Sequence, residues 1–527
     1  MISFAPMVET ILLLLRMPRL RHALLLGVVA APFGCSQPEG GKDVSPTASV
    51  AKAVCGSMDR PETGLQGQVP APLRKRGGFS GFNCNLQTTG QSRGEGAGWQ
   101  LAFFTDSAGH RCSYYDTSPS TANRKQNGVV IIDAGTPSAP TIAGYLTSTV
   151  MNDPMESMKL NRRRQLLGAA GALDGAGGPF IDLYDLSVDC RSPRRLSGAA
   201  TPEPSPAGTE PPIRSDEGAF ARDGRTYYAT NLRTGSIYPI DVSDPGKPIR
   251  LAEWFMPFNQ RTSGLSLSDD GNRAYLTLYG HGAAARQLPQ AGADNGVIIA
   301  DVSDVQARKP EPRVRVISTL LWDDGSGSHQ TIPIVVDGKP YLVAVDEGGS
   351  GTATAAGWMA ACSSGLAPWS MARIIDISDE MRPTIVSKLQ LEVNDPKNCR
   401  TILPDLIGLS GFTYGSHYCS VDNRHDATTL ACSYLESGIR VFDIRDPRHP
   451  KEIAYFVPPS ITTPSPGSQS TRGVVNGRPD HCSAQIRLDA RLKSLFTTCQ
   501  DNGFLVLTFA NGVWPFPTSS TPDGEQN

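Results

Sequence analysis

The chain has 527 residues, and its 49 Lys and Arg residues nearly balance its 51 Asp and Glu residues. This balance implies no basic face, which argues against nucleic acid as a partner. The 53 Gly and 42 Pro residues, together with the near absence of long helical patterns, favour an all-β protein with many loops.

Residues 1–35 have the pattern of an export signal. Counted from Met17, a basic stretch precedes an apolar run at residues 23–31, which is too short to span a bilayer as a permanent helix. Cys35 then follows Gly34 at a lipoprotein-type cleavage point, so we predict that Cys35 is lipidated; a plain secretory signal is the alternative. In both cases we expect an exported protein, which is periplasmic, anchored to the outer membrane or extracellular. Its only membrane contact would be the lipid anchor.

A short unit recurs six times along the chain. Each copy is an apolar strand that ends in Asp and is followed by a turn rich in Ser, Asp and Pro. The Asp side chain can accept backbone N–H bonds in that turn, and Pro restricts its geometry. The copies are VVIIDAGTPSAP from Val129, IDLYDLSVDCRSP from Ile181, IYPIDVSDPGKP from Ile237, VIIADVSDVQARKP from Val297, ARIIDISDEMRP from Ala372 and IRVFDIRDPRHP from Ile439. A seventh copy, GFLVLTF from Gly503, has Thr508 at the Asp position.

Another hairpin precedes each copy, so each repeat holds four strands. Four-stranded units at this spacing are typical of propeller blades, and we predict an all-β, seven-bladed β-propeller with loop insertions. Unrelated hairpins in a β-sandwich are the alternative. The predicted blades span residues 98–149, 158–200, 216–257, 263–321, 328–392, 415–459 and 480–510. A short helix is predicted over 153–170, and loop insertions over 197–215, 348–370 and 393–414.

The predicted domain organisation follows from this repeat. Blade seven has only three clear strands, so we expect its fourth strand from the N-terminal part, around residues 81–88. The predicted parts are a signal peptide at 1–35, a flexible tether at 36–54, an extension that closes the ring at 55–97, the propeller at 98–515 and a disordered tail at 516–527.

The last part of the chain resembles the LVIVD-repeat family of bacterial propeller proteins. The resemblance is most specific in SGIRVFDIRDPRHPKEIAYFVPP from Ser437 and in the neighbouring segments SHYCSVD, LACSYLESG and CQDNGFLVLTF. It covers roughly residues 55–515. What it implies is a propeller on the exported side of the cell envelope, without an established reaction.

Cysteine positions predict disulfides, because an exported chain folds in an oxidising compartment. In the predicted hairpins of blades six and seven, Cys419 faces Cys432 and Cys482 faces Cys499, within disulfide range. We also expect Cys362 to pair with Cys399 across the two insertions of blade five. The remaining four cysteines allow three pairings: Cys55, Cys84, Cys112 and Cys190.

Three of the eight histidines occupy one position of the repeat. They open the first strands of blades five, six and seven, and an acid follows each at the end of the second strand. We expect these side chains to meet at one mouth of the central channel, where imidazoles and carboxylates would suit zinc, copper, manganese or iron. The alternative is structural: the histidines cap the neighbouring blade through backbone hydrogen bonds, and the acids are turn residues. The candidate ligands are His329, His417 and His481, with Glu347, Glu436 and Asp501 as weaker candidates.

Two functional hypotheses follow. The first is a non-enzymatic, cell-envelope propeller that binds a protein or glycan partner as a scaffold. The second is a metal-dependent enzyme, a hydrolase or an oxidase, that uses the histidine cluster at the channel mouth. No other catalytic motif has a convincing structural context; the single GxSxG match, from Gly90, lies in a polar segment without the strand and helix that a nucleophile elbow needs.

Overall fold

The computed structural model describes residues 49–74, 77–117, 124–171, 181–197, 215–257, 260–280, 294–351, 354–406, 412–468 and 479–516. The predicted signal peptide with Cys35, most of the Pro-rich loop at 197–215 and the tail from residue 517 lie outside these residues. Residues 40–527 form one compact unit. In the described part of the chain, no helix is long and apolar enough to cross a membrane.

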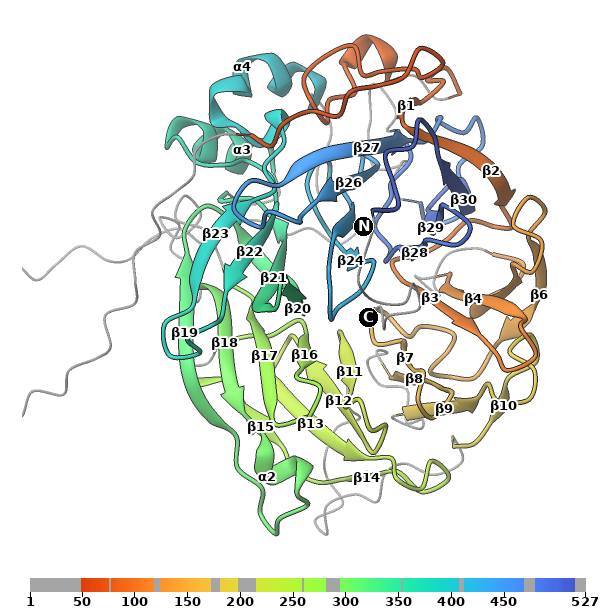
Figure 1. The fold of residues 1–527 in the computed structure, drawn as a ribbon, viewed down its shortest axis with the longest axis vertical. Helices are drawn as coiled ribbons and strands as arrows, with labels where there is room; N and C mark the ends of the chain where they lie inside the picture. The colour runs from red at the N-terminus through yellow and green to blue at the C-terminus, as the bar shows by residue number, and fades with distance from the viewer. Residues whose placement is uncertain are drawn as a thin grey trace, which may run out of the picture. The chain divides into compact units, whose positions relative to one another are not determined.

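Seven antiparallel sheets surround one axis within this unit, which confirms the predicted seven-bladed propeller (Figure 1). In each blade the strand nearest the axis is followed outward by its sequence neighbours. Blade one contains β3 (Leu101–Thr105), β4 (Arg111–Asp116), β5 (Val129–Asp133) and β6 (Thr141–Leu146). Blade two contains β7 (Lys159–Asn161), β8 (Leu166–Ala170), β9 (Ile181–Asp185) and β10 (Arg194–Arg195). Blade three contains β11 (Gly218–Phe220), β12 (Thr226–Asn231), β13 (Ser236–Asp241), β14 (Ile249–Arg250) and β15 (Trp254–Phe255).

The other four blades follow the same plan. Blade four contains β16 (Leu265–Leu267), β17 (Arg273–Leu278), β18 (Asn295–Asp301) and β19 (Arg315–Trp322). Blade five contains β20 (Ser326–Val336), β21 (Lys339–Gly348), β22 (Ala372–Asp376) and β23 (Thr384–Lys388). Blade six contains β24 (Cys419–Val421), β25 (Thr429–Ser433), β26 (Ile439–Asp443), β27 (Lys451–Val457) and β1 (Phe82–Cys84). Blade seven contains β28 (Arg487–Asp489), β29 (Ser494–Cys499), β30 (Gly503–Phe509) and β2 (Leu86–Ser92).

Short helices lie in the segments between strands. The two insertions of blade five, predicted as loops, are partly helical. The helices are α2 (Ser303–Gln306), α3 (Ala355–Ser363), α4 (Cys399–Ile402), η1 (Ala71–Leu73), η3 (Glu392–Asn394), η4 (Pro396–Asn398) and η5 (Leu403–Leu406).

The recurring Asp makes the turn that the sequence predicts. In all six copies its Oδ1 accepts the backbone N–H of the residue two positions later, at 2.8–3.1 Å. The apolar residues before it are buried against the neighbouring blades, whereas the Asp itself is half-buried. The repeat thus combines a strand for the core with a turn that ends it. The aspartates are Asp133, Asp185, Asp241, Asp301, Asp376 and Asp443.

The ring closes through the N-terminal strand β2, which pairs antiparallel with β30 from Leu86 opposite Phe509 onward. The expected strand at residues 81–88 is divided, because Asn85 adopts a positive φ of 58° between β1 and β2. Asn tolerates this left-handed conformation better than most residues. Strand β1 therefore joins β27 of blade six, and only β2 completes blade seven.

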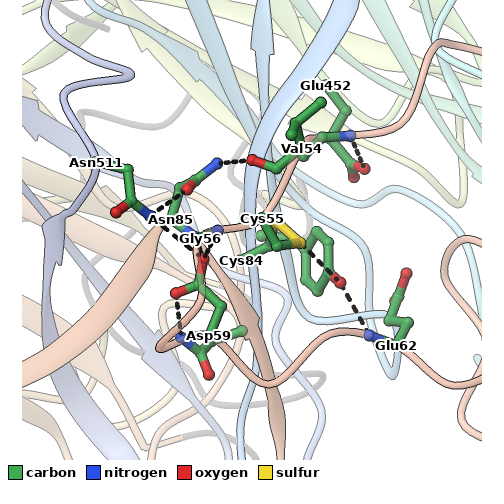
Figure 2. The surroundings of a disulfide bond; sticks show 12 residues. Val54, Cys55, Gly56, Asp59, Glu62, Cys84, Asn85, Glu452 and Asn511 are labelled. Carbon is green, nitrogen blue, oxygen red and sulfur yellow. Dashed lines mark hydrogen bonds between the residues drawn. A yellow bond between two sulfur atoms is a disulfide. The ribbon is translucent and has the colours of Figure 1, made fainter.

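A disulfide and several hydrogen bonds hold the N-terminal segment on blade six (Figure 2). Cys55 is bonded to Cys84 of β1, and Asp59 accepts the backbone N–H groups of Gly56 and Asn85 at 2.8 and 2.9 Å. The chain is ordered by contacts already at Val50, which is 7% exposed and donates its N–H to Gln390. The tether predicted for 36–54 is therefore wrong for its last residues.

All ten described cysteines are paired, in five disulfides. The expected bonds Cys419–Cys432, Cys482–Cys499 and Cys362–Cys399 are present, and the open pairings are Cys55–Cys84 and Cys112–Cys190. In blade six the predicted register is correct, since Cys419 lies opposite Cys432. Five disulfides are typical of a protein that folds in an oxidising compartment outside the cytosol.

Two local predictions are wrong. Residues 153–170 are not helical, and residues 159–170 form the inner hairpin of blade two. Asn161 accepts the N–H of Arg164 and Gln165 takes a positive φ of 53°, which closes the turn. A short apolar run such as that of β8 fits a buried strand and a buried helix equally well. In blade seven the turn is centred one residue later than predicted, since Asp489 lies opposite Ser494.

Because Leu86 lies in the strand that closes the ring, we expect Leu86→Ala to destabilise the protein strongly. The Leu86 side chain is fully buried in the core between blades six and seven, so its truncation should lower the free energy of unfolding by about 2–5 kcal/mol. The adjacent Gln87 is exposed, and Gln87→Ala should change it by less than about 0.5 kcal/mol. Urea unfolding of both variants with disulfides intact measures the difference; equal midpoints would mean that β2 contributes little to closure.

Candidate functional site

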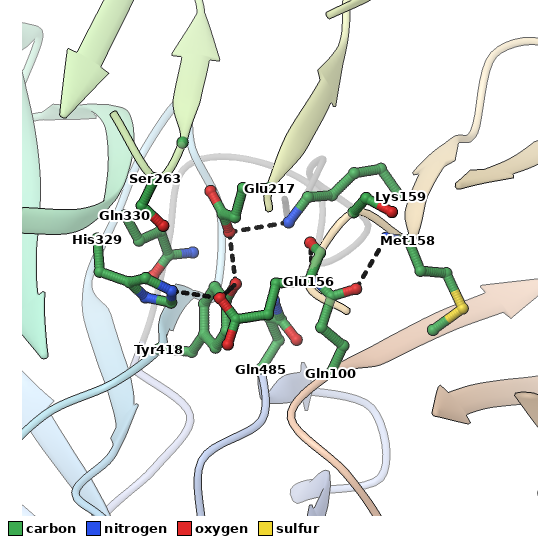
Figure 3. A network of polar contacts seen from close by, with 12 residues as sticks. Gln100, Glu156, Met158, Lys159, Glu217, Ser263, His329, Gln330, Tyr418 and Gln485 are labelled. Atoms are coloured by element: carbon green, nitrogen blue, oxygen red, sulfur yellow. Dashed lines mark hydrogen bonds and ion pairs between the residues drawn. The ribbon is translucent and has the colours of Figure 1, made fainter. Parts of the chain in front are cut away.

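The site lies on the propeller axis, near the starts of the innermost strands. Each blade places one side chain from the start of its innermost strand at the axis. Five of these side chains appear in Figure 3: Gln100, Glu156, Glu217, Ser263 and His329. Blades six and seven add His417 and His481. The Glu156 carboxylate lies between His329 and Gln100 in Figure 3, so an acid of blade two meets an imidazole of blade five.

His329 and His417 are brought together, with ring centroids 4.5 Å apart. Each imidazole uses Nδ1 to hold the next blade: His329 Nδ1 lies 3.2 Å from the His417 carbonyl oxygen, and His417 Nδ1 lies 3.0 Å from that of Ser483. The structural alternative for these histidines is therefore present in the fold. A carbonyl oxygen can only accept a hydrogen bond, so each Nδ1 carries the proton. This bond also leaves each Nε2 directed at the axis, as in metal-binding histidines whose second nitrogen is fixed by a carbonyl.

The two Nε2 atoms face the carboxylates of Glu156, which is buried, and Glu347, which is partly buried. His329 Nε2 hydrogen-bonds Glu156 Oε2, and His417 Nε2 lies 3.5 Å from Glu156 Oε1 and 3.5 Å from Glu347 Oε2. One ligand atom each of Glu156, His329 and His417 lie within 4.8 Å of one another, and all three residues are buried. Two imidazoles and one carboxylate form a ligand set used by zinc and by non-haem iron.

Tyrosine hydroxyls surround the carboxylates. Tyr418 donates to Glu217 Oε1 at 2.6 Å and lies 3.2 Å from Glu156 Oε2. Tyr279 donates to Glu347. Lys159 Nζ lies 3.0 Å from Glu217 Oε1. The first ring of groups around Glu156 is therefore itself hydrogen-bonded, which restricts the rotamers of the candidate ligands.

The electrostatics of the site are those of a buried group of acids. Burial raises the pKa of Glu156, but the imidazoles of His329 and His417 outweigh it and hold that pKa at about 2. Burial lowers the pKa of His329, and the Glu156 carboxylate reverses this and raises it well above the usual value. Burial and the Glu156 charge raise the pKa of Asp216, next to Glu217, to about 7.

The other predicted ligands lie at different places. His481 is fully buried and contacts Trp99, with ring centroids 5.6 Å apart. The same indole also contacts His417 at 5.2 Å and Phe412 at 5.6 Å. Glu436 makes a fully buried ion pair with Arg74 of the N-terminal segment, at 2.6 Å. Asp501 accepts the Ser465 N–H at 2.7 Å, and burial together with its charge raises the pKa of Asp480 to about 7. Among the three predicted acids, Glu347 contacts a candidate histidine, His417, at 3.5 Å.

Sequence reasoning missed Glu156, which occupies the position in blade two that Glu217 occupies in blade three. The two residues pair in an isolated bridge between neighbouring blades. The incorrect helix over 153–170 hid this equivalence, and a strand at that place would have revealed it. Tyr418 follows a predicted ligand directly, but a Tyr in a buried strand has no signal that separates a site residue from a core residue.

Comparisons with known proteins add no ligand or reaction. No protein-family model matches the chain, and no curated protein matches its sequence. The chain is similar to solved propellers at 11–13% identity. A Kuenenia stuttgartiensis hydrazine synthase chain has a TM-score of 0.47 at 12% identity, over 80% of this chain and 97% of that one. The propeller domain of Myceliophteria thermophila Cps50 (Swd1) has 0.46 at 11%, over 81% and 100%, and a Lactobacillus plantarum protein has 0.44 at 13%, over 73% and 96%.

The ion pair of Glu436 predicts a structural phenotype for Glu436→Gln. The variant leaves the Arg74 guanidinium buried without its carboxylate, so the free energy of unfolding should fall by about 3–5 kcal/mol. Denaturant unfolding measures the loss. A Glu436→Gln protein of native stability would contradict the conclusion that Glu436 holds the N-terminal segment through Arg74.

Proposed function

We propose that the protein is an exported propeller of the LVIVD-repeat type that binds a divalent transition metal on its axis through Glu156, His329 and His417. The observation that carries the proposal is the convergence of their three ligand atoms within 4.8 Å from blades two, five and six. Bound zinc, iron, manganese or copper would leave coordination positions open, and such a metal supplies Lewis acidity and an activated water. A metal-dependent hydrolase or oxidase is the enzymatic form of this proposal.

The local charge supports a cation. The carboxyls of Glu156, Asp216, Glu217 and Glu347 lie around the two imidazoles. Lys159 and His329, whose pKa is raised, balance their charge only in part. Burial and the charges of Glu156 and Glu217 raise the pKa of Tyr418 well above its usual value, as expected where negative charge is in excess. A divalent ion would compensate this excess in a site that excludes water.

The other hypothesis is a scaffold for an envelope protein or a glycan, held at the membrane through lipidated Cys35. Its support is the fold, which many binding proteins share and which does not specify a ligand. A scaffold needs no ionisable cluster at its axis, whereas buried ionisable groups of perturbed pKa are common at functional sites. The metal proposal therefore has the more specific support.

Metal binding by purified protein tests the proposal. After treatment with a chelator, the full chain should bind a single equivalent of Zn²⁺ or Mn²⁺ by calorimetry. His417→Ala should abolish this binding while the protein still folds, with a lowered melting temperature because the buried imidazole also contacts the Ser483 carbonyl. His449, whose side chain is 78% exposed, provides the matched control, and His449→Ala should bind as the wild type does. Absence of stoichiometric binding, or equal binding by His417→Ala, would overturn the proposal and favour the scaffold.

The tyrosine next to the ligands should tune the affinity. Tyr418→Phe removes the hydroxyl that contacts Glu156, and loss of such an outer partner weakens metal binding by about 10- to 100-fold. The matched control is Tyr434→Phe in the same blade, because the Tyr434 hydroxyl donates to the Leu389 carbonyl, away from the site. Zn²⁺ titration of both variants measures the effect, and an unchanged affinity for Tyr418→Phe would show that its hydroxyl does not position Glu156.

A further inference from the structure

The structure assigns a second site to the opposite end of the central channel: a cavity that binds a small phosphate-type dianion through arginines of four blades. The cavity has a volume of about 190 Å³ and is lined by the innermost strands of all seven blades. Its lining reaches from Glu217, beside the histidine site, to the hairpin turns at the far ends of those strands.

The charge of this cavity is strongly positive. Among the described residues that line it, six side chains are cationic and one is a carboxylate, Glu217. That carboxylate is already paired with Lys159. The five remaining cations are Arg162, Arg163, Arg222, Arg424 and Arg487.

The arginines come from different directions and converge for a common reason. Four of them lie in the turn that follows an innermost strand, in blades two, three and six, whereas Arg487 opens the innermost strand of blade seven. Because these hairpins ring the axis, an anion on the axis is within reach of several guanidinium groups at once. The guanidinium fork matches the oxygen geometry of phosphate and can bind it with two parallel hydrogen bonds.

Carboxylates of the protein compensate only part of this charge. Asp269 is shared between Arg222, at 3.4 Å, Arg424, at 3.6 Å, and His425, at 3.4 Å. Arg163 is exposed, and within the described part of the chain it makes no hydrogen bond or ion pair. The Arg222 side chain, which lines the cavity, is 41% exposed, so part of the lining is accessible from solvent.

The size of the cavity limits the ligand to a small molecule. Sites for drug-sized ligands occupy roughly 300–1,000 Å³, more than this cavity offers. The excess of guanidinium groups favours a dianion over a monocarboxylate. Inorganic phosphate and a small phosphate monoester share this chemistry. The proposal does not depend on a metal, because the residues that line the cavity do not include Glu156, His329 or His417.

Phosphate titration tests the assignment. Chelator-treated full-length protein should bind inorganic phosphate and glycerol phosphate saturably in calorimetry at constant ionic strength, and chloride should not compete. Arg163→Gln and Arg222→Gln should each weaken binding by about tenfold, the usual effect of losing a charged hydrogen bond. Arg382→Gln is the matched control, because the Arg382 side chain is 86% exposed on an outer turn of blade five. Preference for the monoester over inorganic phosphate would identify a phosphorylated metabolite as the ligand.

Three results would overturn the site. Phosphate binding that is not saturable, or that is equal in Arg163→Gln, Arg222→Gln and the wild type, would show that the arginines serve only the fold. Loss of phosphate binding in His417→Ala, with both arginines intact, would place the anion at the histidine end. Because His417→Ala is also the metal-binding variant, a protein that binds phosphate but no metal would refute the proposed function and leave this site standing.

Discussion

The ladder between β2 and β30 is the interaction on which the rest of the structure depends. A ring of blades has two ends, and every blade except the last can be completed by the strand that follows it in the chain. Here the outermost strand of blade seven comes from the N-terminal segment, so residues more than 400 positions apart in sequence close the ring. Without this closure, the innermost strands have no common axis on which their side chains can meet.

The N-terminal segment is secured by buried charges as well as by strands. Arg74 pairs with Glu436, and Arg440 pairs with both Glu62 and Glu452. Arg440 occupies the same position of the repeat as Arg373, which pairs with Asp324 and Asp346 in blade five. Buried pairs of this kind add little net stability but are costly to break, so they favour one arrangement of the segment over others.

The two ends of the channel carry different charged residues. Innermost strands begin at one end of it, where Glu156, Glu217 and the histidines gather, and they end at the other, where the arginines gather. Since all seven strands run in the same direction, residues at equal positions along them form layers. One layer suits a cation and the other an anion, and Glu217 lines the space between them.

Local chemistry determined what the sequence by itself could predict. Three predicted features act over a few residues, and the structure contains them as predicted. They are the apolar strand of each repeat, the Asp that forms the turn after it, and the cross-strand cysteines of blade six. The equivalence of His329 and His417 also followed from repeat spacing, and the two rings are in contact.

Only the tertiary structure decided which residues complete the site. Glu156 contacts an imidazole 173 residues later in the chain, and Trp99 lies between His417 and His481 at contact distance from both. The acid Glu436 is held by Arg74, which comes from the N-terminal segment outside the repeat. Repeat spacing gives the position of a residue along the axis. Which side chains it contacts there depends on the closed ring, which brings together blades that carry different loop insertions.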